Sequence, residues 1–100
     1  MSHQAAIYRA ENYKIHYQNK VNELQSELKK YEEAIQYYEK NGKELSGEII
    51  RSAEKSYQSG SIDFFRLVQS IENAIQIQLD YLDNLSAFNR IVLEINYLIL

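Results

Sequence analysis

The chain has 100 residues, of which 45% are apolar and 25% are charged, and its formal net charge is −3. This length corresponds to one small domain with a thin core, which neighbouring copies or a larger parent protein would help to complete. The acidic balance argues against nucleic acid as a partner and against adsorption on an anionic membrane face. Because the chain has no cysteine, disulfides, thiolate metal sites and thiol nucleophiles are excluded.

The first residues lack the basic and apolar regions of a signal peptide. No run of about twenty apolar residues is present that would span a bilayer as a helix. If the protein is exported, we expect its signal outside this chain, and the chain is then a fragment of a longer parent.

Apolar residues recur at alternating steps of three and four along the first half of the chain. This spacing is typical of a long helix in coiled-coil-like packing. It predicts one helix over about residues 5–58, roughly 80 Å long at about 1.5 Å per residue. The row consists of Tyr17, Val21, Leu24, Leu28, Tyr31, Ile35, Tyr38, Gly42, Leu45 and Ile49.

Two glycines, Gly42 and Gly47, interrupt this row, and each costs about 1 kcal/mol relative to alanine inside a helix. One interpretation is a local bend or underwinding, or a place where another backbone packs closely. The other is a true break that gives three helices. We favour the bend, because Leu45, Ile49 and Ala53 keep the phase of the row after the glycines.

A seven-residue turn, 57–63, separates the two halves of this proline-free chain. Gly60 suits the left-handed residue that ends a helix. Ser61 can cap the next helix, and Asp63 places a carboxylate at its positive end. We therefore expect a tip at residues 59–61 and a second helix over about residues 62–99.

The second half of the chain carries two apolar rows, so its helix is expected to contact more than one neighbour. One row is Phe64, Val68, Ile71, Ile75, Leu82, Leu85, Val92 and Ile99, and the other is Leu67, Ala74, Tyr81, Phe88 and Ile95. Residues 91–100 are apolar nearly all round, and such a surface is seldom left in water. The predicted face for other copies or partner helices is Leu85, Phe88, Val92, Ile95 and Ile99.

A short connection requires the two helices to lie antiparallel. The predicted fold is therefore all-α, a long antiparallel helical hairpin forming a single unit over residues 1–100. Residues near 5–17 of the first helix are left overhanging or packed on another copy.

Residues that carry chemistry are sparse in this sequence. His3 and His16 match no zinc motif, and Asp80 with Asp83 are expected to form a solvated stripe. No serine has a histidine in its neighbourhood, and no glycine-rich phosphate loop is present. We expect no enzymatic activity, no catalytic residues, no bound metal and no cofactor.

Residues 53–74, from Ala53 through Tyr57 and Gly60 to Ala74, resemble the C-terminal repeat of the TolC-type outer membrane efflux protein family. That family has an A-x-x-x-Y-x-x-G turn followed seven residues later by Leu or Val, here Leu67. Residues 77–90 are similar to the helix that follows the turn, and residues 31–38 to the helix before it. The match covers about residues 20–100 and is closest to the heavy-metal (CusC/CzcC-like) branch.

The resemblance implies that the chain is one periplasmic hairpin of a trimeric α-helical tunnel in the Gram-negative cell envelope. The family's tip docks the periplasmic adaptor (membrane fusion) protein, a role that falls here on Tyr57, Ser59, Gly60 and Ser61. Other copies of the chain are further partners, and an inner-membrane pump is an indirect one. The parent is either a stand-alone outer membrane protein or a fusion to a cation pump. The alternative from the residues alone is a generic helical-hairpin oligomerisation scaffold without a transport role.

Overall fold

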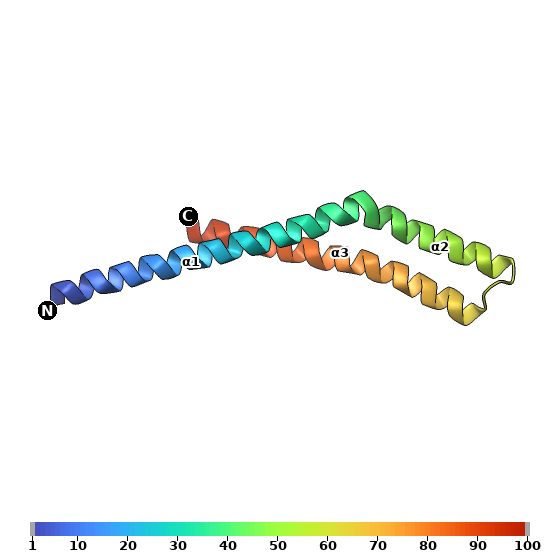
Figure 1. Cartoon of the computed structure of the whole chain (residues 1–100), viewed down its shortest axis with the longest axis horizontal. Coiled ribbons are helices and arrows are strands. Elements are labelled where there is room, and N and C mark those ends of the chain that lie inside the picture. The colour runs from blue at the N-terminus through green and yellow to red at the C-terminus, as the bar shows by residue number, and fades with distance from the viewer. Residues whose placement is uncertain (1, 100) are drawn as a thin grey trace.

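The computed structural model describes residues 2–99 and is built of helices alone over that range. In chain order it contains α1 (Ser2–Tyr37), the π-helical segment η1 (Tyr38–Gly42), α2 (Lys43–Gln58) and α3 (Phe64–Ile99). Figure 1 shows α1, η1 and α2 as one continuous arm, with α3 returning antiparallel beside it. The molecule measures 82 × 22 × 15 Å. The predicted all-α helical hairpin is confirmed.

The core is a narrow line of side chains between the arms, because two helices alone can enclose little volume. Leu24 of α1 and Ile91 of α3 are the large fully buried apolar residues, at 2% and 1% exposure. Ala53 of α2 and Ala74 of α3 are the small ones. The first arm therefore contacts α3 through large side chains far from the tip and through alanines near it, where backbones can approach closely.

The first arm covers one of the two apolar rows on α3 throughout and the other only at Ile71, Leu85 and Val92, which are half-buried. The row of Leu67, Ala74, Tyr81, Phe88 and Ile95 is buried or half-buried throughout. In the other row, Phe64, Val68, Ile75, Leu82 and Ile99 are exposed. The hairpin thus satisfies one face of α3 and leaves a second apolar face open to solvent.

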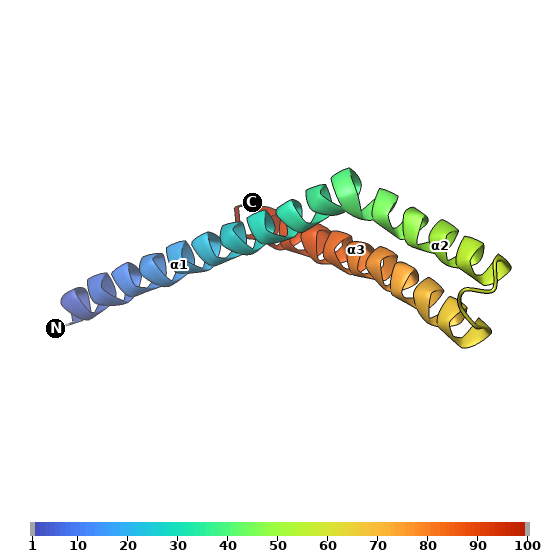
Figure 2. The ribbon, with the colours of Figure 1, turned by 45° about the vertical axis from the view of Figure 1, so that its right-hand side comes forward.

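The first arm bends at η1 without breaking, as Figure 2 shows. The N–H of Lys43 donates to the carbonyl of Tyr38, five residues back, which is the hydrogen bond of a π-helix. Because a π-helical turn contains one more residue than an α-helical turn needs, the positions that face α3 shift by one residue after η1. Ser46 is therefore buried, whereas Leu45 is 47% exposed. The bend is confirmed, but the prediction that Leu45 keeps the phase of the row is wrong.

Gly42 occupies a place that a larger residue would disturb. A Cβ added there would stand 2.8 Å from Cδ2 of Tyr38. The Tyr38 ring stacks on Tyr81 of α3, with centroids 4.1 Å apart and an interplanar angle of 19°. Gly42 therefore lets the Tyr38 ring lie over its own helix and reach the returning arm.

Alanine substitution of the two glycines is expected to give opposite results. Gly42→Ala should lower the free energy of unfolding by about 1 kcal/mol, because displacing Tyr38 from Tyr81 outweighs the gain in helix propensity. Gly47→Ala should raise it by about 0.5–1 kcal/mol, since only the mobile end of Arg51 lies near the added methyl. Urea unfolding followed by circular dichroism measures both. Stabilisation by both substitutions would contradict the role assigned to Gly42.

The N-terminal part of α1 extends beyond the end of α3 (Figure 1). Residues 2–20 are all exposed. The two arms last touch where the Tyr17 hydroxyl donates to the carbonyl of Leu98 at 2.8 Å. Among residues 2–99, no helix combines enough length with enough apolar character to cross a membrane.

Candidate functional site

The tip is a sharply defined turn that ends α2 through Gly60. The φ angle of Gly60 is +81°, in the left-handed region that glycine adopts at little cost. The N–H of Ser61 donates to the carbonyl of Ser56 at 2.8 Å, and the N–H of Gly60 to that of Tyr57 at 3.1 Å. This pair of bonds is the Schellman motif. The turn is therefore held by its own backbone and needs no partner to form.

Serine side chains brace the outer side of this turn. The Ser59 hydroxyl donates to the carbonyl of Ser56 at 3.0 Å. The Ser59 and Ser61 hydroxyl oxygens lie 2.9 Å apart and share a hydrogen bond. Ser59, Gly60 and Ser61 are all exposed. The structure brings the predicted tip residues together on one open surface.

Asp63, and not Ser61, caps α3. The Asp63 carboxylate accepts the N–H of Arg66 at 2.8 Å, which satisfies one of the free donors in the first turn of the helix. The expectation that Ser61 supplies the cap is wrong, because α3 begins at Phe64 and Asp63 is the residue directly before it. The connection between α2 and α3 is longer than expected as a result, spanning residues 59–63.

Three aromatic rings stand beside the turn. The Tyr57 ring packs edge-on against Phe64, with centroids 6.2 Å apart and an interplanar angle of 63°. Phe65 is 72% exposed and Phe64 is 64% exposed. Sequence reasoning assigned Phe64 to a packing row and did not single out Phe65. Two adjacent phenylalanines directly after a cap could have indicated an exposed ring, because consecutive helical positions cannot both face one neighbour.

A second candidate surface is the uncovered face of α3, which we call the outer seam. Its ten positions alternate by three and four residues from the tip to the C-terminal end of α3, and all ten are exposed. They are Phe65, Val68, Glu72, Ile75, Leu79, Leu82, Ser86, Asn89, Leu93 and Asn96. This is the spacing of a coiled-coil seam, and six of the ten residues are apolar.

The face of α3 that the sequence predicts to contact other copies does not coincide with the outer seam. Leu85, Phe88, Val92 and Ile95 are half-buried, and among the predicted five only Ile99 is largely exposed, at 64%. Leu100, at the end of the apolar stretch, lies outside the described residues. A role for these five residues in contacts with other copies stays a prediction, and the free apolar surface of α3 is the outer seam.

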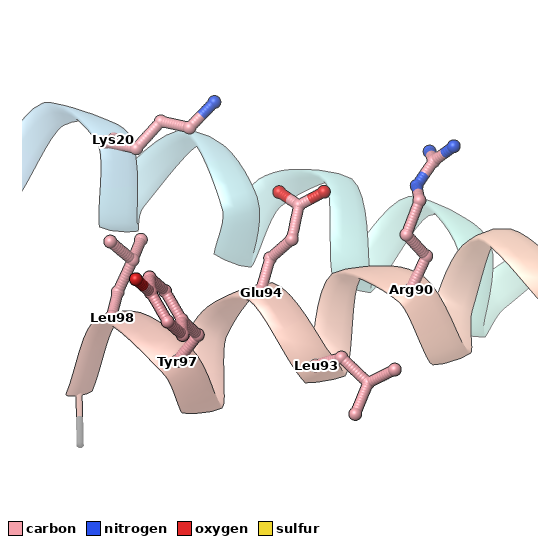
Figure 3. A pocket seen from close by; sticks show the side chains of 6 residues that line it. All are labelled: Lys20, Arg90, Leu93, Glu94, Tyr97 and Leu98. Carbon is pink, nitrogen blue, oxygen red and sulfur yellow. The ribbon is translucent and has the colours of Figure 1, made fainter.

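A shallow hollow of about 370 Å³ lies where the outer seam approaches the C-terminal end of α3. Figure 3 shows Leu93 on the side of α3 that faces away from α1, whereas Lys20 comes from α1 itself. Tyr97, at 84% exposure, adds a large ring beside the seam. The hollow is thus apolar in its lining and charged along its rim, as expected where a further helix could pack.

The tyrosine pair at the bend is the remaining polar cluster between the arms. The Tyr81 hydroxyl donates to Oε1 of Glu39 at 3.4 Å. Partial burial, together with the Glu39 carboxylate, raises the pKa of Tyr81 above its ordinary range. Within residues 2–99, no three histidine or acidic side chains gather to hold a metal ion. The cluster joins the arms across the bend and holds no arrangement typical of a catalytic site.

No family model, curated protein or solved structure matches this chain. The fold therefore defines a structural class only, that of an extended antiparallel helical hairpin with an exposed turn.

Proposed function

We propose that this chain is a periplasmic tunnel hairpin of a TolC-like efflux component. Its tip would dock the periplasmic adaptor of a tripartite efflux system, with metal cations as the transported class. The hairpin would lie in the Gram-negative envelope beside other copies of itself and reach an inner-membrane pump only through the adaptor.

The observation that carries this proposal is the presentation of the tip. Two long arms hold a backbone-braced turn at one extreme end of the molecule (Figure 1). Nothing lies within 4 Å of the position a Cβ of Gly60 would take. A partner can therefore approach the Gly60 backbone directly, and this is the position where the sequence resembles the family's docking turn.

The exposed apolar face of α3 also supports the proposal. Six exposed apolar side chains lie along the outer seam, and gathered apolar surface of this kind often marks a contact site. In a tunnel wall, the outer seam would lie against the helices of the neighbouring hairpin.

Replacing Gly60 by tryptophan in the full-length parent should abolish adaptor association. The new ring has open space around it in the hairpin, so it would project into the path of the partner. We expect co-purification of the adaptor to fall at least about tenfold, with loss of metal resistance. Helicity should be unchanged.

Gly60→Ala is the matched control, because alanine carries the same strain as tryptophan at a φ of +81° but adds little bulk. It should bind the adaptor nearly as well as the parent does. If the tryptophan variant retains full adaptor association and metal resistance, the docking role of the tip is wrong.

A generic oligomerisation scaffold is the second candidate, and the outer seam favours it because a helix row of this kind serves self-association without any transport role. The two candidates differ at the tip. A scaffold would tolerate any turn-forming sequence at residues 59–61, and Gly60→Trp should leave its self-association unchanged because the tip takes no part in it.

A further inference from the structure

We infer that two copies of this chain pair antiparallel through the outer seam of α3, with the two-fold axis between Asp80 and Tyr81. The inference goes beyond the proposed function and concerns the chain on its own, in which no neighbouring hairpin of a tunnel covers the outer seam.

The seam has the geometry needed for such a pair. Its ten positions run from Phe65 to Asn96 and keep the 3.5-residue period of the covered face of α3. Val68, Ile75, Leu79, Leu82 and Leu93 are between 36% and 69% exposed. Each can therefore give a substantial apolar area to a neighbouring helix.

One antiparallel register uses every seam position. When Leu79 faces Leu82 of the second copy, Val68 faces Leu93 and Ile75 faces Ser86. Phe65 then faces Asn96, next to the exposed Tyr97 ring. The same surface serves both copies, which is the self-complementarity that a two-fold interface requires.

Charge selects this orientation over a parallel one. In the antiparallel register, Glu72 faces Asn89 of the second copy and stands on the same side of the seam as its Arg90. A parallel, in-register pair would place Glu72 against Glu72, and like charges there oppose pairing. Glu72, the one charged residue of the seam, therefore avoids a like charge on the seam of the second copy only when the helices run in opposite directions.

The size of the contact predicts moderate affinity. The seam spans about 47 Å along α3, and a strip about 10 Å wide corresponds to on the order of 500 Å² per copy. The total of about 1,000 Å² is at the lower limit of specific interfaces, so we expect a readily reversible dimer.

An antiparallel pair differs from the tunnel arrangement, in which all tips lie at one end. It is the form expected when no other helices cover the seam. The direction of pairing can therefore be measured separately from docking at the tip.

Sedimentation equilibrium of the 100-residue chain should show a monomer–dimer equilibrium. Leu79→Lys should weaken the dimer about tenfold or more, because it places a charge at the centre of the interface. Leu45→Lys is the matched control, since both leucines are 47% exposed and Leu45 lies on α2 away from the seam. It should leave the equilibrium unchanged, and circular dichroism should show equal helicity for both variants.

Spin labelling determines the direction, and the absence of native cysteine makes a single site possible. With one label at Gln69→Cys, an exposed position beside the seam and not on it, the antiparallel register places the two labels about 35 Å apart along the axis. A parallel pair would bring them within about 15 Å of each other. The charge pattern gives a further check: Glu72→Arg and Arg90→Glu should each weaken the dimer, and the double variant should restore it.

A monomer at all concentrations overturns the inference. So does a short distance between the labels at position 69, or equal effects of the Leu79 and Leu45 substitutions.

Discussion

Replacing Ile91 by alanine is expected to lower the free energy of unfolding by about 2–4 kcal/mol. Ile91 is 1% exposed in a core with few large buried side chains, so the cavity left behind has little nearby structure to collapse into it. A loss of this size is a large share of the total stability of a small domain, commonly about 5–15 kcal/mol. Urea unfolding at one dilute protein concentration measures it, because dimerisation would add to the apparent stability.

Ile15→Ala provides the control for this experiment. Ile15 is 56% exposed in the overhanging part of α1, so the same chemical change should alter stability by no more than about 0.5 kcal/mol. Equal losses for the two variants would show that the contact between α1 and α3 is not the centre of the fold.

Ala74→Leu is expected to cost about 1–3 kcal/mol through overpacking. Ala74 is completely buried, in the part of α3 that packs along the first arm towards the tip. A leucine there can be accommodated only if the arms move apart. Because alanine and leucine have similar helix propensities, the loss would come from packing and not from the helix itself.

The matched substitution is Ala10→Leu, on the exposed overhang, which should leave stability within about 0.5 kcal/mol of the parent. Thermal unfolding followed by circular dichroism compares the two. If Ala74→Leu proves neutral, the arms do not pack closely around Ala74. The tip would then not be held in a fixed position by the two arms.

Much of the fold was predictable because it rests on local properties of the chain. The three–four spacing of apolar residues and the absence of proline predict long helices. One glycine in a polar segment predicts where they reverse. The left-handed Gly60 follows from the same short-range chemistry, since few other residues adopt that conformation without strain.

The candidate site was predictable only in part, because it depends on where α3 begins and on contacts between the two arms. Ser61 and Asp63 are both suitable caps by type, and Asp63 fills the role because α3 begins at Phe64, directly after it. The inward place of Ser46 depends on the π-helical turn. That turn accompanies the packing of Tyr38 on Tyr81, which lies 43 residues away along the chain.

By itself, the sequence determined that this protein is helical, where its arms reverse and which residue makes the reversal, because backbone preference and apolar period act over a few residues. Only the tertiary structure decided how much of each of the two apolar rows on α3 the first arm covers. Both rows have the spacing of a helix interface, and the choice between them depends on the rotation and register of one arm against the other. That choice leaves the outer seam free, and with it the surface through which a second copy is proposed to bind.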